Sequence, residues 1–305
     1  MSSIPVSGQK SGGFFRRARE SRSFQRRLSI IVRLVIAVFL IIFAIFPVVW
    51  VISASFNPIA TLASQRLIPE NAGLGNYRSL LNSEVFPYWR WFWNSIKIST
   101  ISTVLSVSIT TVAAYAFSRF RFTGRQNMLK MILLIQVFPG LLAIVAIFLM
   151  ISDVGQVIPI FGLDTHAGLI LVYMGGAMGI NIWLMKGFFD TIPREIDESA
   201  MVDGASDWYI FTRLLLPLMR PILVVIGILS FIGTYGDFVL ARVLLKSTEQ
   251  YTLMVGLQIF TSGQFAQNWG EFTAGALIGA LPIMIIYLVL QDQIVGGLTQ
   301  GSVKG

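Results

Sequence analysis

The segment DTIPREIDESAMVDGASDWYIFTRLLLPLMRP, residues 190–221, is the one long stretch between the apolar blocks of this chain that is compact, charged and amphipathic. Its pattern predicts two short helices, residues 193–202 and 207–215, on either side of Gly204. A glycine readily adopts the left-handed backbone conformation that ends a helix, and a serine such as Ser206 can cap the start of the next helix. We therefore expect a helix–turn–helix that docks onto something outside the bilayer.

The end of this segment and its charges limit what it can do. Pro217 and Pro221 are expected to stop the second helix before the chain turns apolar again, because proline cannot continue a helix from its interior. We expect the carboxylates to lie on an exposed face with no pocket around them: Glu195, Asp197, Glu198, Asp203 and Asp207. The segment is therefore interpreted as a docking element and not as acid–base machinery.

The apolar blocks on both sides of the segment are long enough to cross a membrane. Hydrophobic residues make up 55% of the chain and charged residues 12%, against roughly 45–50% and 25% in soluble proteins. A helix needs about 20 residues to cross the hydrocarbon core. The sequence predicts an all-α, polytopic bundle of six transmembrane helices, at about residues 34–52, 96–117, 128–151, 167–185, 222–239 and 272–289.

The basic residues predict the orientation of this bundle. Lys and Arg accumulate on the cytoplasmic side of membrane proteins. Of the 23 Lys and Arg residues, 17 lie in the N-terminal arm, the second and fourth connections and the tail, and five lie in the other connections. Both termini and the charged segment are therefore predicted to be cytoplasmic. Because these residues flank the spans, the net charge of +8 is interpreted as this topology signal, and we expect membrane lipid but no nucleic acid as a partner.

The sequence predicts no catalytic residue and no metal site. It contains no G-x-x-x-x-G-K-[ST] loop for ATP phosphates and no cysteine. Its single histidine, His166, has no second histidine with which to bind a metal and is expected to form a hydrogen bond in a loop.

The charged segment also carries a recognisable motif. ESAMVDG, nine residues and then LLLP resemble the EAA signature of ABC-importer permeases, which reads EAA, three residues, Gly, nine residues and I-x-L-P. The direct matches are Glu198, Ala200, Gly204, Leu216 and Pro217, while Ser199 and Leu214 stand where Ala and Ile are usual. The stretches FWNSIKIS, AYAFSRFRFTGR, IPIFGLDTHAG, YTLMVGLQ and GGLTQGSVKG extend the resemblance over nearly the whole chain. It is closest to the smaller permease subunits of maltose/maltodextrin importers.

This resemblance implies a type I ABC-importer permease fold and a subunit that is not an enzyme by itself. Such a subunit translocates maltose, maltodextrin or a similar oligosaccharide across the bacterial cytoplasmic (inner) membrane. The implied partners are a second homologous permease, two ATP-binding cassette subunits and an external solute-binding protein. The chain itself would bind no cofactor, because ATP and Mg²⁺ would lie on the partner ATPase.

The resemblance also divides the chain and assigns roles to its residues. Residues 1–33 would form a basic cytoplasmic arm, 34–295 the permease domain, and 296–305 a cytoplasmic tail. Within the permease domain, residues 190–217 would be the coupling helices that contact the ATPase. In the tail, the resemblance implies that Gly297, Gly301 and Lys304 reach the ATPase as well.

Polar residues near the spans are candidates for the translocation path or for a surface facing the partner. An ionisable group there is costly unless it faces protein or water, which singles out Asp237, close to Tyr235. Gln136 precedes Pro139, which is expected to kink the third span. A stripe of hydroxyl residues on the second span favours helix packing over solute binding: Ser99, Ser102, Thr103, Ser106 and Thr110.

Two alternatives stay open at this point. The chain can be an ABC permease for another sugar or polar solute, since specificity is shared with partners that this sequence does not contain. A self-sufficient secondary transporter or channel also explains the spans. That second alternative gives the EAA pattern no role, and it usually places ion-coupling carboxylates at mid-bilayer, which we do not find here.

Overall fold

The computed structural model describes residues 12–58, 67–262 and 268–300, and the regular secondary structure of these residues is helical throughout. The all-α fold class predicted from the apolar blocks is therefore confirmed. The longer helices are α1 (Gly12–Phe56), α3 (Tyr88–Arg119), α5 (Gly140–Val157), α6 (His166–Thr191), α10 (Arg220–Tyr235) and α13 (Trp269–Gln300). The shorter ones are α2 (Gly75–Leu81), α4 (Arg125–Val137), α7 (Glu195–Val202), α8 (Asp207–Tyr209), α9 (Leu216–Leu218), α11 (Val239–Leu244) and α12 (Leu253–Ser262).

Five described helices are long and apolar enough to cross a membrane. They are residues 26–56 of α1, then α3, α5 and α6, and residues 269–291 of α13. A sixth span results if residues 207–218 and 220–235, which are bent by 76° relative to each other, are counted as one. The chain is thus a polytopic helical membrane protein.

One predicted span is divided into two helices. The sequence predicts a single span over residues 128–151, whereas α4 ends at Val137 and α5 begins at Gly140. Phe138 and Pro139 lie between them in an extended conformation, with ψ angles of 128° and 113°. A proline lacks the N–H of a helix, and the residue before it avoids helical geometry, so the expected kink becomes a complete break.

The centre of the bundle is the contact between α3 and α6, which is the most extensive between any two helices described. The hydroxyl stripe of α3 is buried, with Ser99, Ser102 and Ser106 each 1% exposed and Thr110 fully buried. The Thr110 hydroxyl donates to the carbonyl of Ser106 at 2.6 Å and lies 3.7 Å from the sulfur of Met185 on α6. Small hydroxyl residues allow such close approach, and the burial of the stripe supports its interpretation as helix packing.

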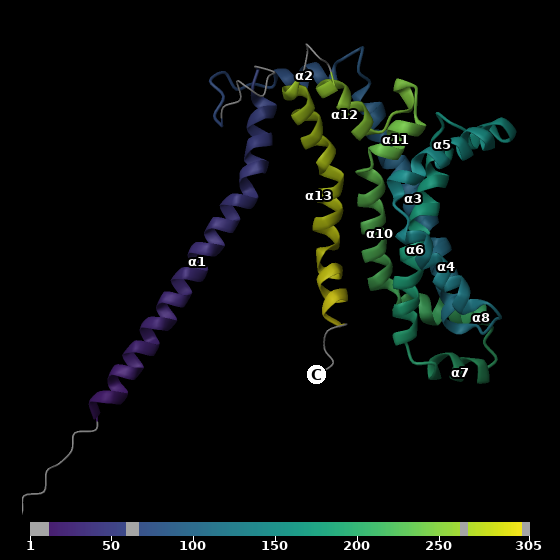
Figure 1. The fold of residues 1–305 in the computed structure, drawn as a ribbon, viewed down its shortest axis with the longest axis horizontal. Coiled ribbons are helices and arrows are strands. Elements are labelled where there is room, and N and C mark those ends of the chain that lie inside the picture. The colour runs from purple at the N-terminus through teal and green to yellow at the C-terminus, as the bar shows by residue number, and fades with distance from the viewer. Residues whose placement is uncertain (1–11, 59–66, 263–267, 301–305) are drawn as a thin grey trace, which may run out of the picture.

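The two ends of the bundle carry different elements (Figure 1). α7 and α8 lie at one end, and α2, α11 and α12 lie at the opposite end. α1 leans away from the other helices, and its residues 31–49 are exposed on all sides. It is attached near its C-terminal end, where the Asn76 amide donates hydrogen bonds to the carbonyls of Ser55 at 2.9 Å and Asn57 at 2.8 Å.

Candidate functional site

The turn predicted in the segment 190–221 is present at the end of the bundle that carries α7. α7 covers Glu195–Val202, and Gly204 follows with a φ of +82°. Ser206 caps α8, because its hydroxyl accepts a hydrogen bond from the N–H of Tyr209 at 3.3 Å. A residue with a β-carbon is strained at positive φ, so Gly204 fixes the reversal between the two helices.

The second helix of the segment ends at Leu218, between the two prolines that were predicted to stop it, and three residues beyond the predicted end at Leu215. α8, the π-helical residues Ile210–Leu215 and α9 follow one another without a break as far as Leu218, with Pro217 inside α9. The wide π turn lies directly before Pro217, whose missing N–H removes a hydrogen bond from the preceding turn. The 76° bend follows α9, and Pro221 lies in the first turn of α10.

The prediction that the carboxylates are exposed was wrong for Asp197, and the prediction that no pocket surrounds them was wrong for four of them: Asp197, Glu198, Asp203 and Asp207. Asp197 is only 5% exposed, and its Oδ2 lies 2.5 Å from Nε of Arg119 in an ion pair with both side chains buried. α7 thus lies against the C-terminal end of α3. Burial raises the pKa of the Asp197 carboxyl, and the guanidinium of Arg119 opposes that effect.

Further hydrogen bonds tie the end of α3 to the chain between α6 and α7. Arg119 donates through Nη2 to the carbonyl of Ile192 at 3.1 Å. Arg194 donates in the opposite direction, to the carbonyl of Ser118 at 3.1 Å. The Ser118 hydroxyl donates to Oδ1 of Asp190 at 2.6 Å. These contacts and the ion pair connect the start of the charged segment rigidly to α3.

A cavity of about 180 Å³ opens beside the ion pair, lined by Tyr115, Arg119, Phe120, Arg194, Asp197, Glu198, Met201 and Asp207. Oδ1 of Asp197 is buried and has no hydrogen-bond partner among the described residues. A second cavity, of about 640 Å³, lies at the turn around Gly204 and reaches Leu214. The segment is therefore hollowed on both sides of α7.

The outward face of the segment is more apolar than its charges suggest. Glu198 and Ser199 are exposed, as a docking contact requires. Large side chains are exposed beside them, and sequence reasoning missed them: Met201 at 52%, Val202 at 88%, Trp208 at 66% and Tyr209 at 53%. Exposed apolar and aromatic side chains on neighbouring helices are typical of a protein–protein contact. The dipeptide Trp208–Tyr209, which begins two residues after the cap Ser206, was the signal available in the sequence.

The inner face of the segment packs into the bundle. Ala200 is 9% exposed and belongs to a core cluster that includes Tyr115 of α3 and Phe189 of α6. Leu214 and Leu216 are half-buried against the same cluster, while Pro217 is exposed. The motif residues therefore form two groups. Glu198, Ser199 and Pro217 are exposed, whereas Ala200, Leu214 and Leu216 pack in the cluster that includes residues of α3 and α6.

The candidate residues for a translocation path do not lie together. Asp237 follows α10, where it accepts hydrogen bonds from the Tyr173 hydroxyl at 2.8 Å and from the N–H of Ala241 at 3.1 Å. Tyr235 is buried, and its hydroxyl donates to the carbonyl of Gly279 at 2.8 Å. Both groups are thus engaged by neighbouring helices.

Gln136 lies at a different place, on α4. Its amide covers Gly179 of α6 so closely that a β-carbon there would lie 2.2 Å from Nε2. It also lines a cavity of about 1050 Å³ between these helices.

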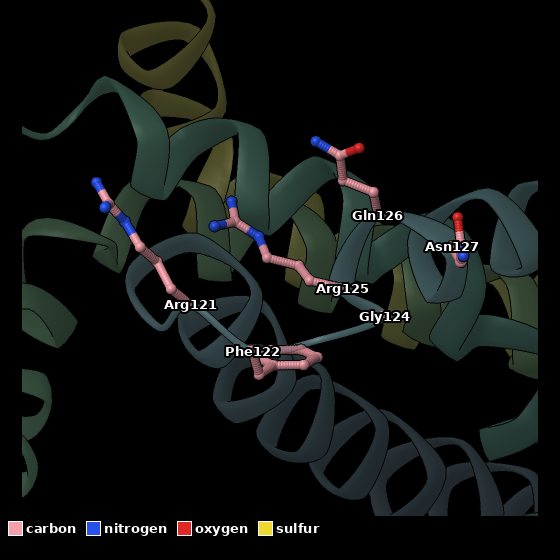
Figure 2. Close-up of a pocket in the computed structure, with 6 residues that line it drawn as sticks. All are labelled: Arg121, Phe122, Gly124, Arg125, Gln126 and Asn127. Atoms are coloured by element: carbon pink, nitrogen blue, oxygen red, sulfur yellow. The ribbon is translucent and has the colours of Figure 1, made fainter.

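The turn between α3 and α4 forms a basic pocket of about 490 Å³, lined by Arg121, Phe122, Gly124, Arg125, Gln126 and Asn127. Figure 2 shows the side chains of Arg121 and Arg125 extending to the same side of this turn. Gly124, with a φ of +87°, precedes α4. These residues belong to the second connection, one of the basic segments that predict the orientation of the chain.

The predicted tail contacts fall mostly outside the described residues. Gly297 lies within α13, and Gly301 and Lys304 lie beyond the last described residue. Among the described residues, no three His, Cys, Asp or Glu side chains are grouped so that they could hold a metal ion.

The sequence matches the family described as "Binding-protein-dependent transport system inner membrane component" over residues 109–299. The maltose/maltodextrin transport system permease protein MalG of Vibrio vulnificus is 42% identical over 274 residues, which cover 86% of this chain and 91% of that protein. The galactooligosaccharides transport system permease protein GanQ of Bacillus subtilis is 38% identical over 282 residues, which cover 92% and 98%.

Solved structures show the same fold. A chain of a bacterial ABC transporter involved in the import of the acidic polysaccharide alginate has a TM-score of 0.75 and 25% identity, covering 88% of this chain and 97% of that one. A chain of the bacterial alginate ABC transporter in complex with an alginate pentasaccharide-bound periplasmic protein has a TM-score of 0.64 and 18% identity, covering 88% and 94%.

Proposed function

The chain belongs to the family of binding-protein-dependent transport system inner membrane components, and we propose that it translocates maltose, maltodextrin or a similar oligosaccharide through an ABC importer. It is a multi-pass protein of the bacterial inner membrane and a permease subunit of a sugar importer. The observation that carries the choice of sugar is the identity of 40–42% to maltose/maltodextrin permeases over most of both chains.

In the proposed complex, the segment 190–217 contacts a cytoplasmic ATP-binding cassette subunit. The exposed carboxylate of Glu198 supplies a charged contact, and the exposed side chains around Val202 and Trp208 supply the apolar part. The small residues Ser199 and Ala200 allow close approach. Two such ATPase subunits, a second homologous permease and an external solute-binding protein complete the assembly. The chain itself hydrolyses nothing, since ATP and Mg²⁺ are bound by the partner.

Coupling follows from how the segment is held. A ligand shifts a conformational equilibrium only through contacts that differ between the two states. When ATP brings the ATPase subunits together, the docked segment moves with them. The Arg119–Asp197 ion pair then carries that movement into α3, and the Tyr115–Phe189 cluster carries it into α6. The two central helices of the bundle, α3 and α6, therefore respond to the nucleotide.

The choice of sugar is tested by uptake into proteoliposomes that contain the complete complex. Radiolabelled maltose and longer maltodextrins are expected to enter in an ATP-dependent manner. Galactooligosaccharides are the second candidate, because the permease for these sugars is 38% identical over 92% of the chain. Excess unlabelled galactooligosaccharide should leave maltose uptake unchanged. If the complex takes up galactooligosaccharide but neither maltose nor maltodextrin, the chain belongs to the second candidate.

The orientation of the chain is tested by labelling of single cysteines. The chain has no cysteine of its own, so each introduced thiol reports one position. Ser11→Cys and Ser302→Cys are expected to resist an impermeant maleimide in intact cells, because the distribution of basic residues predicts cytoplasmic termini. Glu84→Cys, in the exposed loop between α2 and α3, is the matched control and is expected to react. Efficient labelling at either terminus would reverse the proposed orientation.

The proposed contact of the tail is tested by truncation. Deleting residues 297–305 removes Gly297, Gly301 and Lys304, which would reach the ATPase. We expect the truncated complex to be present in the membrane in normal amount, but to show lower transport or altered basal ATPase activity. Parental transport and hydrolysis would show instead that the tail is dispensable, as exposed chain termini often are.

A further inference from the structure

The α11–α12 loop, residues 245–252, is held by side chains that come from other parts of the chain. Nε1 of Trp91 on α3 donates a hydrogen bond to the carbonyl of Thr248 at 2.8 Å. The amide of Asn94, one turn further along α3, donates to the carbonyls of Glu249 at 2.9 Å and Tyr251 at 3.0 Å. Trp91 is fully buried and Asn94 is 7% exposed, so water competes little for these contacts.

Asp164 holds the beginning of the same loop. Its Oδ1 accepts hydrogen bonds from the N–H groups of Lys246 at 2.8 Å and Ser247 at 2.9 Å, and its Oδ2 accepts one from the Ser247 hydroxyl. Its own N–H donates to the carbonyl of Leu244 at 2.8 Å. Partial burial acts to raise the pKa of this carboxyl, but the hydrogen bonds from Ser247 and Lys246 hold it below its ordinary value. The group is therefore ionised when it holds the loop.

The backbone of Asp164 is itself in an unusual conformation. Its φ is +59°, the one positive φ of a non-glycine residue among those described. Such a conformation persists only where the surroundings hold it, and it often occurs at functional positions. Here it turns the carboxylate so that both oxygens reach the loop.

Two more side chains hold the end of the loop. Nε2 of His166 lies 2.9 Å from the carbonyl of Gln250 and donates to it, since a carbonyl can only accept. The hydroxyl of Ser95 accepts a hydrogen bond from the N–H of Leu253 at 2.7 Å, where α12 begins. The predicted role of His166 as a hydrogen-bonding residue is thus confirmed, but the residue is the first of α6 and not part of a loop.

The loop therefore has a fixed conformation and carries two exposed charged side chains, one of which, Lys246, places its ammonium 5.2 Å from the ring centre of Phe148 on α5. Its main-chain groups from Lys246 to Leu253 are largely bound by the five side chains described above, while the Lys246 and Glu249 side chains are exposed. It lies at the end of the bundle opposite α7, next to α12 (Figure 1). A surface that is already ordered loses little conformational entropy on binding, which favours recognition of a partner.

We propose that Asp164 is a positioning residue, which fixes the conformation in which the α11–α12 loop meets the external solute-binding protein. The inference rests on the proposed function, which places this end of the bundle outside the cytoplasm and the ATPase at the other end. The loop presents both signs of charge, which suits a polar surface of a soluble protein better than lipid or an apolar helix.

The test compares two substitutions of Asp164 in the complete complex in proteoliposomes. Asp164→Gly tolerates the positive φ but removes the carboxylate, whereas Asp164→Asn tolerates it and keeps an oxygen that can accept from both N–H groups. Sugar-loaded binding protein is titrated and ATPase activity is measured. For Asp164→Gly we expect the concentration that gives half-maximal stimulation to rise about tenfold, equivalent to about 1.4 kcal/mol. The maximal and basal rates should stay at the parental level.

Asp164→Asn is expected to remain within about twofold of the parent, because its amide oxygen still accepts from the N–H groups of Lys246 and Ser247, while the Ser247 hydroxyl can accept from the amide NH2 group. Asp153→Asn, which alters an exposed carboxylate on α5, is the matched control and should have no effect. Parental half-saturation in Asp164→Gly would overturn the proposal. A smaller amount of assembled complex, or a lower basal ATPase rate, in Asp164→Gly would also overturn it. The loop would then serve folding or contact with the second permease. If the parent complex itself shows no stimulation by binding protein, the proposed function fails first.

Discussion

Replacing Gly204 with valine is expected to lower ATP-driven sugar uptake roughly tenfold or more while the chain still inserts into the membrane. Gly204 has a φ of +82°, and a β-branched residue at positive φ is strained by on the order of 1–3 kcal/mol. No heavy atom lies within 4 Å of the position that a β-carbon would occupy, so the cost comes from the backbone and not from a collision. The turn would open and α8 would point in another direction. The exposed side chains of α7 would then be separated from Trp208 on α8.

Asparagine at the same position is the matched control for this prediction. Its side chain is similar in size to valine, but it enters the left-handed region much more readily. Gly204→Asn should therefore keep most of the parental uptake. Measurement of uptake, ATPase activity and co-purified ATPase in both variants separates strain from size. Equal defects in the two variants would show that the conformation of the turn is not what matters.

Removing the Asp197 carboxylate is expected to uncouple hydrolysis from transport more strongly than removing both members of its ion pair. Breaking a buried pair by deleting one partner costs about 3–5 kcal/mol, because a charge is left without its partner. The adjacent cavity of about 180 Å³ can admit water to Arg119, so we expect the lower end of that range. α7 would detach from α3, and its movement would no longer reach the bundle.

The double variant Arg119→Met/Asp197→Leu tests whether the pairing itself matters. Replacing a buried ion pair with apolar side chains of similar volume is often neutral for stability. Asp197→Leu alone should lose uptake, and the double variant should regain a substantial part of it. Uptake and hydrogen exchange of α7, measured across the double-mutant cycle, give the coupling between the two positions. Additive effects of the single substitutions would contradict a role for the pair in coupling.

The features of the site that local chemistry determines were predictable from the sequence. Gly204 and Ser206 are placed by rules that involve only their neighbours, and the structure has the left-handed turn and the cap where these rules put them. The all-α membrane fold was likewise predictable, because a bilayer requires long apolar helices whose backbone groups are all satisfied within the helix.

The features that depend on distant residues were not predictable from one sequence. Asp197 looks like one of several exposed acids until Arg119, from the end of α3, is placed beside it. Pro217 and Pro221 indicated where the second helix ends, but not the π turn over residues 210–215 or the extension of the helix to Leu218. The role of Asp164 also depends on tertiary contacts, since its partners Lys246 and Ser247 follow far later in the chain.

The central claim is that the segment 190–217 is where the ATPase subunit docks, and site-specific cross-linking tests it most directly. A benzophenone attached to a cysteine at Val202, which is 88% exposed on α7, would lie at the proposed contact. The same probe at Val85, which is 74% exposed in the loop between α2 and α3, is the matched control at the opposite end of the bundle. In complexes that transport sugar, we predict that the probe at position 202 cross-links to an ATP-binding cassette subunit and the probe at position 85 does not. A transporting complex that forms no cross-link from position 202, or forms the same one from position 85, would contradict the account.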